Sequence, residues 1–242
     1  MLQILNIMTV NEIMQQLKQL GNESTKKVLT KHGAREPFFG VKIEDLKKIV
    51  KKVKTDYPLS LELFNTGNSD AMYLAGLIAD PGKMTPNDLN NWAEKAYWYM
   101  LSEFTVAWVA SESPYGTRLA LEWINSDKEN IASTGWATLA SIAAFKKDEE
   151  IDPALYRRLL DRVSKTILTE KNRVRHTMNI FVISVGGYCT HLSEVAISVA
   201  STLGKVHVEM GGTACKVPDA TEYIQKMHQR GCLGKKRKSA RC

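Results

Sequence analysis

The sequence has few cysteines, and their placement excludes the folds that depend on them. Of its 242 residues only four are cysteines, all in the last quarter of the chain. No two form a Cys-x-x-Cys pair, so neither a disulfide framework nor a zinc ribbon is expected. Three histidines, at 191, 207 and 228, lie among them at spacings that match no ligand pattern. We expect no metal ion, no other cofactor, and a reducing cytoplasm as the location. The four cysteines are Cys189, Cys215, Cys232 and Cys242.

Long hydrophobic runs are also missing. A polar or charged residue interrupts every apolar stretch before it reaches the roughly 20 residues that cross a bilayer. The apolar segment 1–8 is short and has neither a basic leader nor a small-residue cleavage site, so we do not expect a signal peptide. The 15 glycines and 7 prolines form no linker or low-complexity segment. These absences predict a soluble protein in which residues 1–231 form one domain.

Positive charge is in moderate excess. The chain has 33 Lys and Arg residues against 26 Asp and Glu residues, a formal charge of +7. Five positive charges fall in the segment 232–242, and +7 less these five leaves +2 for the rest. We expect this segment to be a flexible basic tail. A basic chain often binds a polyanion, but a disordered tail that touches nucleic acid nonspecifically would account for the charge equally well.

Apolar residues recur at helical spacing along almost the whole chain, whereas the alternation typical of half-buried strands is rare. Short turns with Pro or Gly, such as Asp80-Pro81-Gly82, separate the predicted helices. Many compact helices joined in this way indicate stacked helical hairpins rather than a four-helix bundle. The predicted helices are 9–20, 43–54, 69–80, 87–111, 115–125, 128–145, 153–169, 173–187, 190–203 and 218–230.

Internal similarity supports stacking. The segments 68–77, 129–139 and 172–180 each place polar residues at or before a helix start, and the first two are rich in small side chains. Small side chains let neighbouring helices approach closely, as a repeat array requires. The segment 204–218 differs, because its glycines and β-branched residues predict an ordered loop. Such a loop either lines a site or caps the last repeat.

The segment 39–49 reads FGVKIEDLKKI and resembles the turn and basic amphipathic helix near the N-terminus of the DNA alkylation repair family, the HEAT-like repeat DNA glycosylases. The resemblance continues through the helical pattern to about residue 200. It implies an all-α fold, a HEAT-like repeat α-α superhelix (solenoid) of stacked helical pairs. It also implies a basic concave face that holds duplex DNA and, in active members, the excision of alkylated purines.

The residues that perform excision in this family are mostly missing here. Active members use a Trp-Asp-x-x-Asp element, an Arg on the next helix pair and a second Trp. The best register puts Glu103 at the first Trp, Ala107 at the catalytic carboxylate and Phe181 at the second Trp, and no Arg lies in 133–135. If the chain cleaves glycosidic bonds, Glu103 is the candidate for stabilising the cationic sugar, with Arg175 as its partner. The alternative for Glu103 is a local helix contact.

Two clusters and one tryptophan are candidates for DNA binding. Arg175 and Asn179 are four residues apart and share a helix face, near a helix start that favours phosphate. Such a pair either contacts DNA or joins two repeats through a buried network. The second cluster is a basic stretch at 26–35 followed by the lysines at 47, 48, 51 and 52 of the predicted helix 43–54; it either contacts phosphate or is only a solvated face. The candidate DNA-binding residues are Lys47, Lys48, Lys51, Trp108, Arg173, Arg175, His176 and Asn179.

Three functions remain open from the sequence. The preferred one is a DNA-binding relative of the alkylpurine DNA glycosylases, monomeric, that engages the backbone of duplex, damaged or branched DNA and lacks the usual catalytic residues. The second is an active DNA glycosylase with a rearranged site built on Glu103 and Arg175. The third is a HEAT-like scaffold for a protein partner, since an extended concave surface suits proteins as well as DNA.

Overall fold

The computed structural model describes residues 8–241, so the apolar segment 1–7 and Cys242 lie outside the described residues. Within that range the chain forms thirteen α-helices and no strand. These are α1 (Val10–Leu20), α2 (Glu23–Lys31), α3 (Ile43–Val53), α4 (Tyr57–Asn65), α5 (Ser69–Ile78), α6 (Pro86–Lys95), α7 (Ala107–Glu112), α8 (Gly116–Trp123), α9 (Glu129–Phe145), α10 (Pro153–Thr166), α11 (Asn172–Tyr188), α12 (Ser193–Leu203) and α13 (Ala220–Gln229). A π-helix, η1 (Met100–Val106), precedes α7, and three short 3₁₀ helices are η2 (Asp148–Glu150), η3 (Ile167–Thr169) and η4 (Thr190–Leu192).

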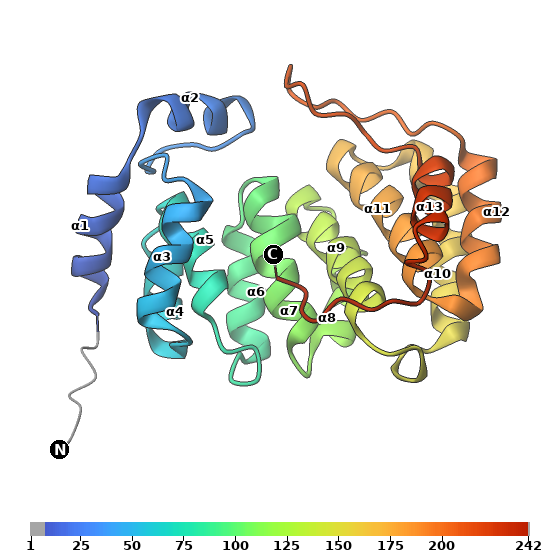
Figure 1. Ribbon diagram of the computed structural model, residues 1–242, viewed down its shortest axis with the longest axis horizontal. Helices are drawn as coiled ribbons and strands as arrows, with labels where there is room; N and C mark the ends of the chain where they lie inside the picture. The colour runs from blue at the N-terminus through green and yellow to red at the C-terminus, as the bar shows by residue number, and fades with distance from the viewer. Residues whose placement is uncertain (1–7, 242) are drawn as a thin grey trace.

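Most of the helices stand side by side in a row from α1 at one end to α12 at the other, and α2 lies across the row near α1 (Figure 1). Neighbours in space are mostly neighbours in sequence: α4 packs on α5, α8 on α9, and α12 on α11. α9 and α11 pack along one another and form the centre of the C-terminal half. The arrangement confirms the predicted all-α stack of helical pairs.

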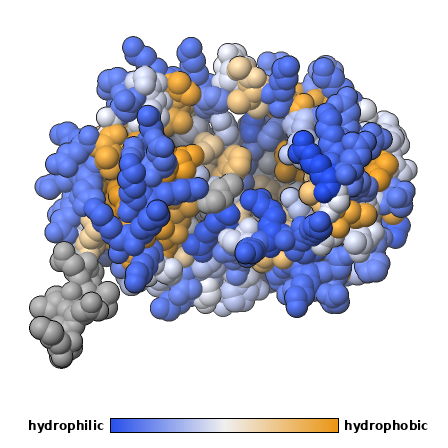
Figure 2. All heavy atoms as spheres, viewed as in Figure 1, coloured by the Kyte–Doolittle hydropathy of each residue, from blue (hydrophilic) through white to orange (hydrophobic). Residues whose placement is uncertain are grey.

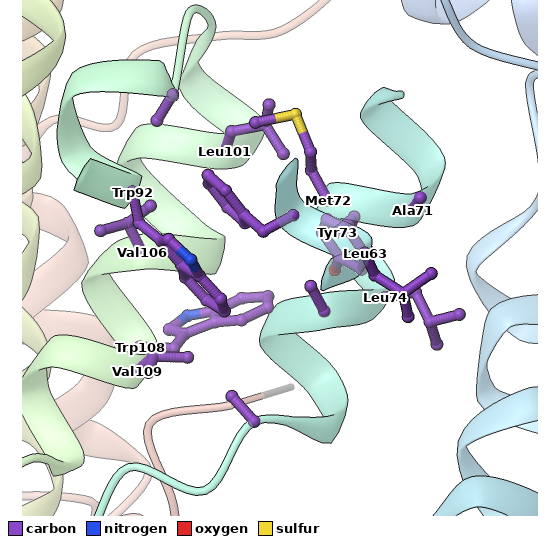
Figure 3. Close-up of a cluster of buried hydrophobic side chains, with 14 of the residues drawn as sticks. Leu63, Ala71, Met72, Tyr73, Leu74, Trp92, Leu101, Val106, Trp108 and Val109 are labelled. Atoms are coloured by element: carbon purple, nitrogen blue, oxygen red, sulfur yellow. The ribbon is translucent and has the colours of Figure 1, made fainter. Parts of the chain in front are cut away.

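Two adjoining hydrophobic clusters fill the stack. The first extends from Ile13 to Trp123 and includes Ala240, and the second extends from Ala120 to Ile224. In the first cluster, the Tyr73 ring of α5 lies edge-to-face against the Trp108 ring of α7, with the centroids 5.8 Å apart (Figure 3). The Trp92 ring stacks on the ring of Phe64 with the centroids 4.1 Å apart. Offset aromatic contact of this kind adds to the area that such large side chains bury.

Small side chains bring the helices into close contact, as the sequence predicts. A Cβ added at Gly76 of α5 would lie 2.5 Å from a methyl carbon of Thr105. One added at Gly135 of α9 would lie 2.9 Å from the carbonyl oxygen of Ala120 in α8. Neither distance allows a side chain, so both glycines are required by helix packing.

Two helices were not predicted, and one predicted helix is divided. α2 is nine residues long and contains only two apolar residues, Val28 and Leu29, so its sequence shows no apolar repeat over several turns. α4 is only nine residues long, with a proline in its first turn. The predicted helix 87–111 breaks after α6, where Ala96 leaves helical geometry and the Trp98 indole N–H donates to the Ser69 hydroxyl at 3.0 Å.

The C-terminal segment is packed, which corrects the expectation of a flexible tail. Ala240 is 2% exposed and belongs to the first hydrophobic cluster. Lys236 Nζ lies 2.8 Å from Asp148 Oδ1, and Arg241 Nε lies 3.3 Å from Glu112 Oε2. Backbone carbonyls near helix C-termini also accept hydrogen bonds from the tail, including those of Ala143, Ala144 and Leu77. The cations thus compensate carboxylates and the negative ends of helices, which sequence composition alone does not reveal.

Within residues 8–241, no single helix has the length and apolar composition needed to cross a membrane. The consecutive helices 172–188 and 190–203 meet both conditions only as a pair that is bent by 116°. Over the same described range, no group of three or more His, Cys, Asp or Glu side chains is arranged to hold a metal ion.

Candidate nucleic-acid interface

Glu103 lies on the π-helix η1, in the middle of the row of helices. A π-turn inserts an extra residue and shifts the side chains that follow, and such turns are common at functional sites. Only 4% of the Glu103 side chain is exposed. A carboxylate buried to this extent needs a charged or hydrogen-bonded partner.

The partner of Glu103 is Arg173, in the first turn of α11. Arg173 Nε and Nη2 donate to the two carboxylate oxygens of Glu103, each at 2.6 Å. The guanidinium also lies over the Tyr99 ring, 4.6 Å from its centroid. His176 Nδ1 is 3.3 Å from Glu103 Oε2. A two-point ion pair stacked on an aromatic ring fixes both side chains and compensates the carboxylate charge.

The proposed pairing of Glu103 with Arg175 was wrong. Residues two apart on a helix point to nearly opposite sides, so Arg173 and Arg175 cannot reach the same group. Arg175 is half-buried instead and directs Nη2 toward the Asn172 side chain at 3.5 Å. The sequence thus indicated the correct two elements, η1 and α11, but the wrong residue on α11.

A central cleft of about 290 Å³ adjoins the ion pair. Its walls come from η1, α7, α9, α11, α13 and the C-terminal tail. Trp108 lines the cleft although it is only 4% exposed, so its ring is a wall rather than a projecting side chain. Figure 2 shows the face viewed there hollowed near its middle, between the middle helices and those of the C-terminal end. The residues that line the cleft include Glu103, Phe104, Trp108, His176, Ile180 and Tyr188.

The segment 204–219 lies over the ion pair. The Asn172 side chain donates to the Glu209 carbonyl and accepts from the Glu209 N–H, at 2.9 and 2.7 Å. Met210 Sδ is 3.7 Å from Arg173 Nη1. A Cβ added at Gly211 would meet the Lys31 carbonyl oxygen at 3.3 Å, so the tip of the segment reaches the end of α2. Of the two expectations for this loop, lining a site is the one that these contacts support.

The remaining candidate residues lie in different settings. Asn179 is fully buried and donates to the Pro218 carbonyl at 2.8 Å, which is the buried-network alternative. Lys47, Lys48 and Lys51 are exposed on α3, and Lys48 Nζ lies 2.6 Å from Asp45 Oδ1. Ala107 and Phe181, at the family's catalytic carboxylate and second Trp, are both fully buried in the core.

Sequence reasoning missed the role of Asp70. Its carboxylate accepts hydrogen bonds from the backbone N–H groups of Phe39, Gly40 and Val41, at 2.6, 3.1 and 3.0 Å. Burial raises the pKa of Asp70 above its ordinary value, and the three N–H donors oppose that change. The FGV turn that carries the family resemblance is therefore held in place by a carboxylate some thirty residues later in the chain. Tyr99 was missed too, since nothing local marks it as a platform for an arginine.

A row of packed helical pairs with a cleft near its middle defines the chain as a HEAT-like repeat protein. Residues 13–224 match the family model described as DNA alkylation repair enzyme. The chain belongs to this family.

The chain is also similar to known proteins in sequence and in fold. An uncharacterized protein of Listeria monocytogenes is 35% identical over 230 residues, covering 93% of this chain and 99% of that protein. An uncharacterized protein of Listeria innocua matches to the same extent. A solved structure superimposes with a TM-score of 0.90 at 39% identity, covering 97% of this chain and 100% of that chain. That protein is described as one of a new family related to the HEAT-like repeat DNA glycosylases, with affinity for branched DNA structures.

Proposed function

We propose that this protein binds branched DNA and does not excise alkylated bases. The observation that carries the proposal is the ion pair of Glu103 and Arg173. Both carboxylate oxygens accept from the guanidinium at 2.6 Å. A carboxylate neutralised in this way is not available to stabilise a positively charged sugar, and the arginine is not available to a phosphate.

The other parts of an excision site are also missing. Ala107 stands at the position of the catalytic carboxylate and has no charge to offer. No arginine lies in 133–135, where α9 presents buried Ser133, Thr134 and Gly135. The fold that supports excision is thus retained without its reactive groups, which favours binding as the function.

The related protein of 39% identity supports branched DNA as the ligand. The net charge of +7 supports contact with phosphate. Lys47 and Lys51 are exposed and have no carboxylate within ion-pair distance among residues 8–241, so they are the first candidates for the DNA backbone. Trp108 and His176 would border the DNA from the central cleft.

The test compares a four-way junction with a linear duplex of the same base composition, by fluorescence anisotropy over a range of salt. Tighter binding of the junction, and an affinity that falls steeply with salt, is expected, because each phosphate contact contributes a slope of about −0.9. Lys47→Ala with Lys51→Ala should reduce that slope, whereas Lys165→Ala, on α10, is the matched control. A flat salt response or equal affinity for both DNAs would contradict the proposal.

Single-turnover release of alkylated purines from duplex DNA, with protein in excess, tests the second half of the proposal. No release is expected. Release that disappears in Glu103→Gln, under conditions where thermal unfolding shows that this variant is folded, would instead establish a glycosylase with a rearranged site.

A further inference from the structure

A second pocket opens beside the central cleft, between α13 and the C-terminal tail. Its volume is about 410 Å³. The two cavities share Tyr188, Tyr223, Met227 and Arg237 as lining residues, so they adjoin one another. We call this second cavity the tail pocket. Its size is within the range of sites that hold small ligands.

Five cations line the tail pocket. Two of them are paired: Lys236 with Asp148 at 2.8 Å, and Lys226 with Glu222 at 3.2 Å. Arg230 and Lys235 are exposed, and no carboxylate of residues 8–241 lies within ion-pair distance of either. The pocket therefore carries positive charge that the described part of the chain does not compensate. The five are Lys226, Arg230, Lys235, Lys236 and Arg237.

Two tyrosines lie among these cations. Tyr223 is 50% exposed and belongs to neither hydrophobic cluster, so its ring is available to a ligand. Tyr188 is half-buried and borders both cavities. Aromatic rings interleaved with cations are the arrangement by which proteins bind single-stranded nucleic acid: bases stack on the rings and phosphates meet the cations.

Hydrogen bonds hold the C-terminal tail against the end of α9. The Arg237 N–H donates to the Ala144 carbonyl at 2.8 Å, and Lys236 Nζ donates to the Ala143 carbonyl at 2.9 Å. Further along, Arg241 and Ala240 anchor the end of the tail near Glu112. The chain segment that forms this side of the pocket is thus already ordered when a ligand arrives, which lowers the entropic cost of binding.

We infer that the tail pocket binds an unpaired stretch of DNA strand, with its phosphates at Arg230 and Lys235 and a base on the Tyr223 ring. The next base would pass Tyr188 into the central cleft, whose apolar wall includes Phe104 and Trp108. A paired base cannot reach such a ring, because it is stacked inside its duplex until it is extruded. The inference rests on the proposed function in that the unpaired strand belongs to a branched DNA.

The experiment uses the full chain and an oligothymidylate of about ten nucleotides, within the site size of single-strand binders. One 2-aminopurine in the oligonucleotide reports stacking through its fluorescence. Tyr223→Ala should weaken binding about ten-fold or more and remove the stacking signal, whereas Tyr223→Phe should keep both. Arg230→Ala should weaken binding and lower its salt dependence.

Matched controls lie elsewhere on the surface. Tyr115 is also exposed and has an arginine, Arg118, over its ring at 5.9 Å, so Tyr115→Ala should leave binding unchanged. Arg158 is exposed on α10, and Arg158→Ala is the control for Arg230→Ala. Thermal unfolding of each variant establishes that it is folded.

The outcomes separate this inference from the proposed function. Binding of a four-way junction that survives in Tyr223→Ala, together with loss of oligothymidylate binding, would support both. Oligothymidylate binding that Tyr223→Ala does not change would overturn the tail pocket and leave junction binding standing. If polyglutamate of equal charge binds as tightly as the oligothymidylate, the pocket is a general anion site and the inference is wrong. If the unsubstituted protein does not bind the four-way junction but binds oligothymidylate in a way that depends on Tyr223, only the proposed function is overturned.

Discussion

Arg173 and Glu103 are 70 residues apart in the sequence and form a two-point ion pair with both N–O distances at 2.6 Å. The pair joins the first turn of α11 to the π-helix η1. It lies under the segment 204–219, with Met210 against the guanidinium. The contact therefore ties three parts of the chain together at the edge of the central cleft.

Breaking this pair from one side should destabilise the fold. Glu103→Gln keeps the shape of the side chain but leaves the Arg173 charge without compensation, at an expected cost of about 3 kcal/mol in the free energy of unfolding. The double variant Glu103→Gln with Arg173→Gln should recover part of that loss, because neither charge then remains buried. Urea unfolding measures both. Strictly additive effects of the two substitutions would show that the pair is not coupled.

The clamp of Asp70 on the FGV turn predicts a local effect. Asp70→Asn keeps one acceptor oxygen but turns an NH₂ group toward backbone N–H donors, and we expect a loss of about 2–3 kcal/mol. Amide hydrogen exchange should rise at residues 39–41 more than in α9. Asp161→Asn removes an exposed carboxylate paired with Lys165 and should cost less than about 0.5 kcal/mol. Equal costs for the two variants would argue against the clamp.

The tail contact of Lys236 with Asp148 should depend on pH. Burial alone would raise the pKa of Asp148, but hydrogen bonds from Lys236 and Thr190 outweigh it and hold that pKa below 3.8. A carboxylate whose pKa is lowered by folding contributes stability above its unfolded pKa, and this is lost as pH falls through the folded value. Lys236→Ala should therefore cost about 1 kcal/mol at pH 7 and less at pH 3, as measured by urea unfolding. A cost that does not change between these pH values would exclude a charged contact.

The cysteines should differ in reactivity. Burial raises the pKa of the Cys189 thiol to about 11, so at pH 8 only about one Cys189 in a thousand is a thiolate. Cys215 is exposed. Iodoacetamide labelling followed by peptide mass spectrometry should find Cys215 modified rapidly and Cys189 modified only after unfolding in urea. Rapid labelling of Cys189 in the native protein would mean that the interface of α11 with the tail opens readily.

The fold followed from the sequence wherever apolar and small residues recur at helical spacing over several turns. The helices 128–145 and 173–187 were predicted nearly to their ends for this reason, and they pack on neighbours close in sequence. α2 was missed because its nine residues include only two apolar ones, Val28 and Leu29, which is too few to show a repeat. The family could be recognised from the turn at 39–41, whose geometry depends on Asp70.

Only the tertiary structure decided which side chains meet. Glu103 and the basic start of α11 stood out in the sequence, but the phase of two helices selects Arg173 rather than Arg175 as the partner. The tail looked like a solvated basic segment, yet it packs, because carboxylates and helix-end carbonyls from distant repeats happen to line its path. A local pattern records what each segment can bury. It does not record long-range partners, since these depend on how the repeats stack in space.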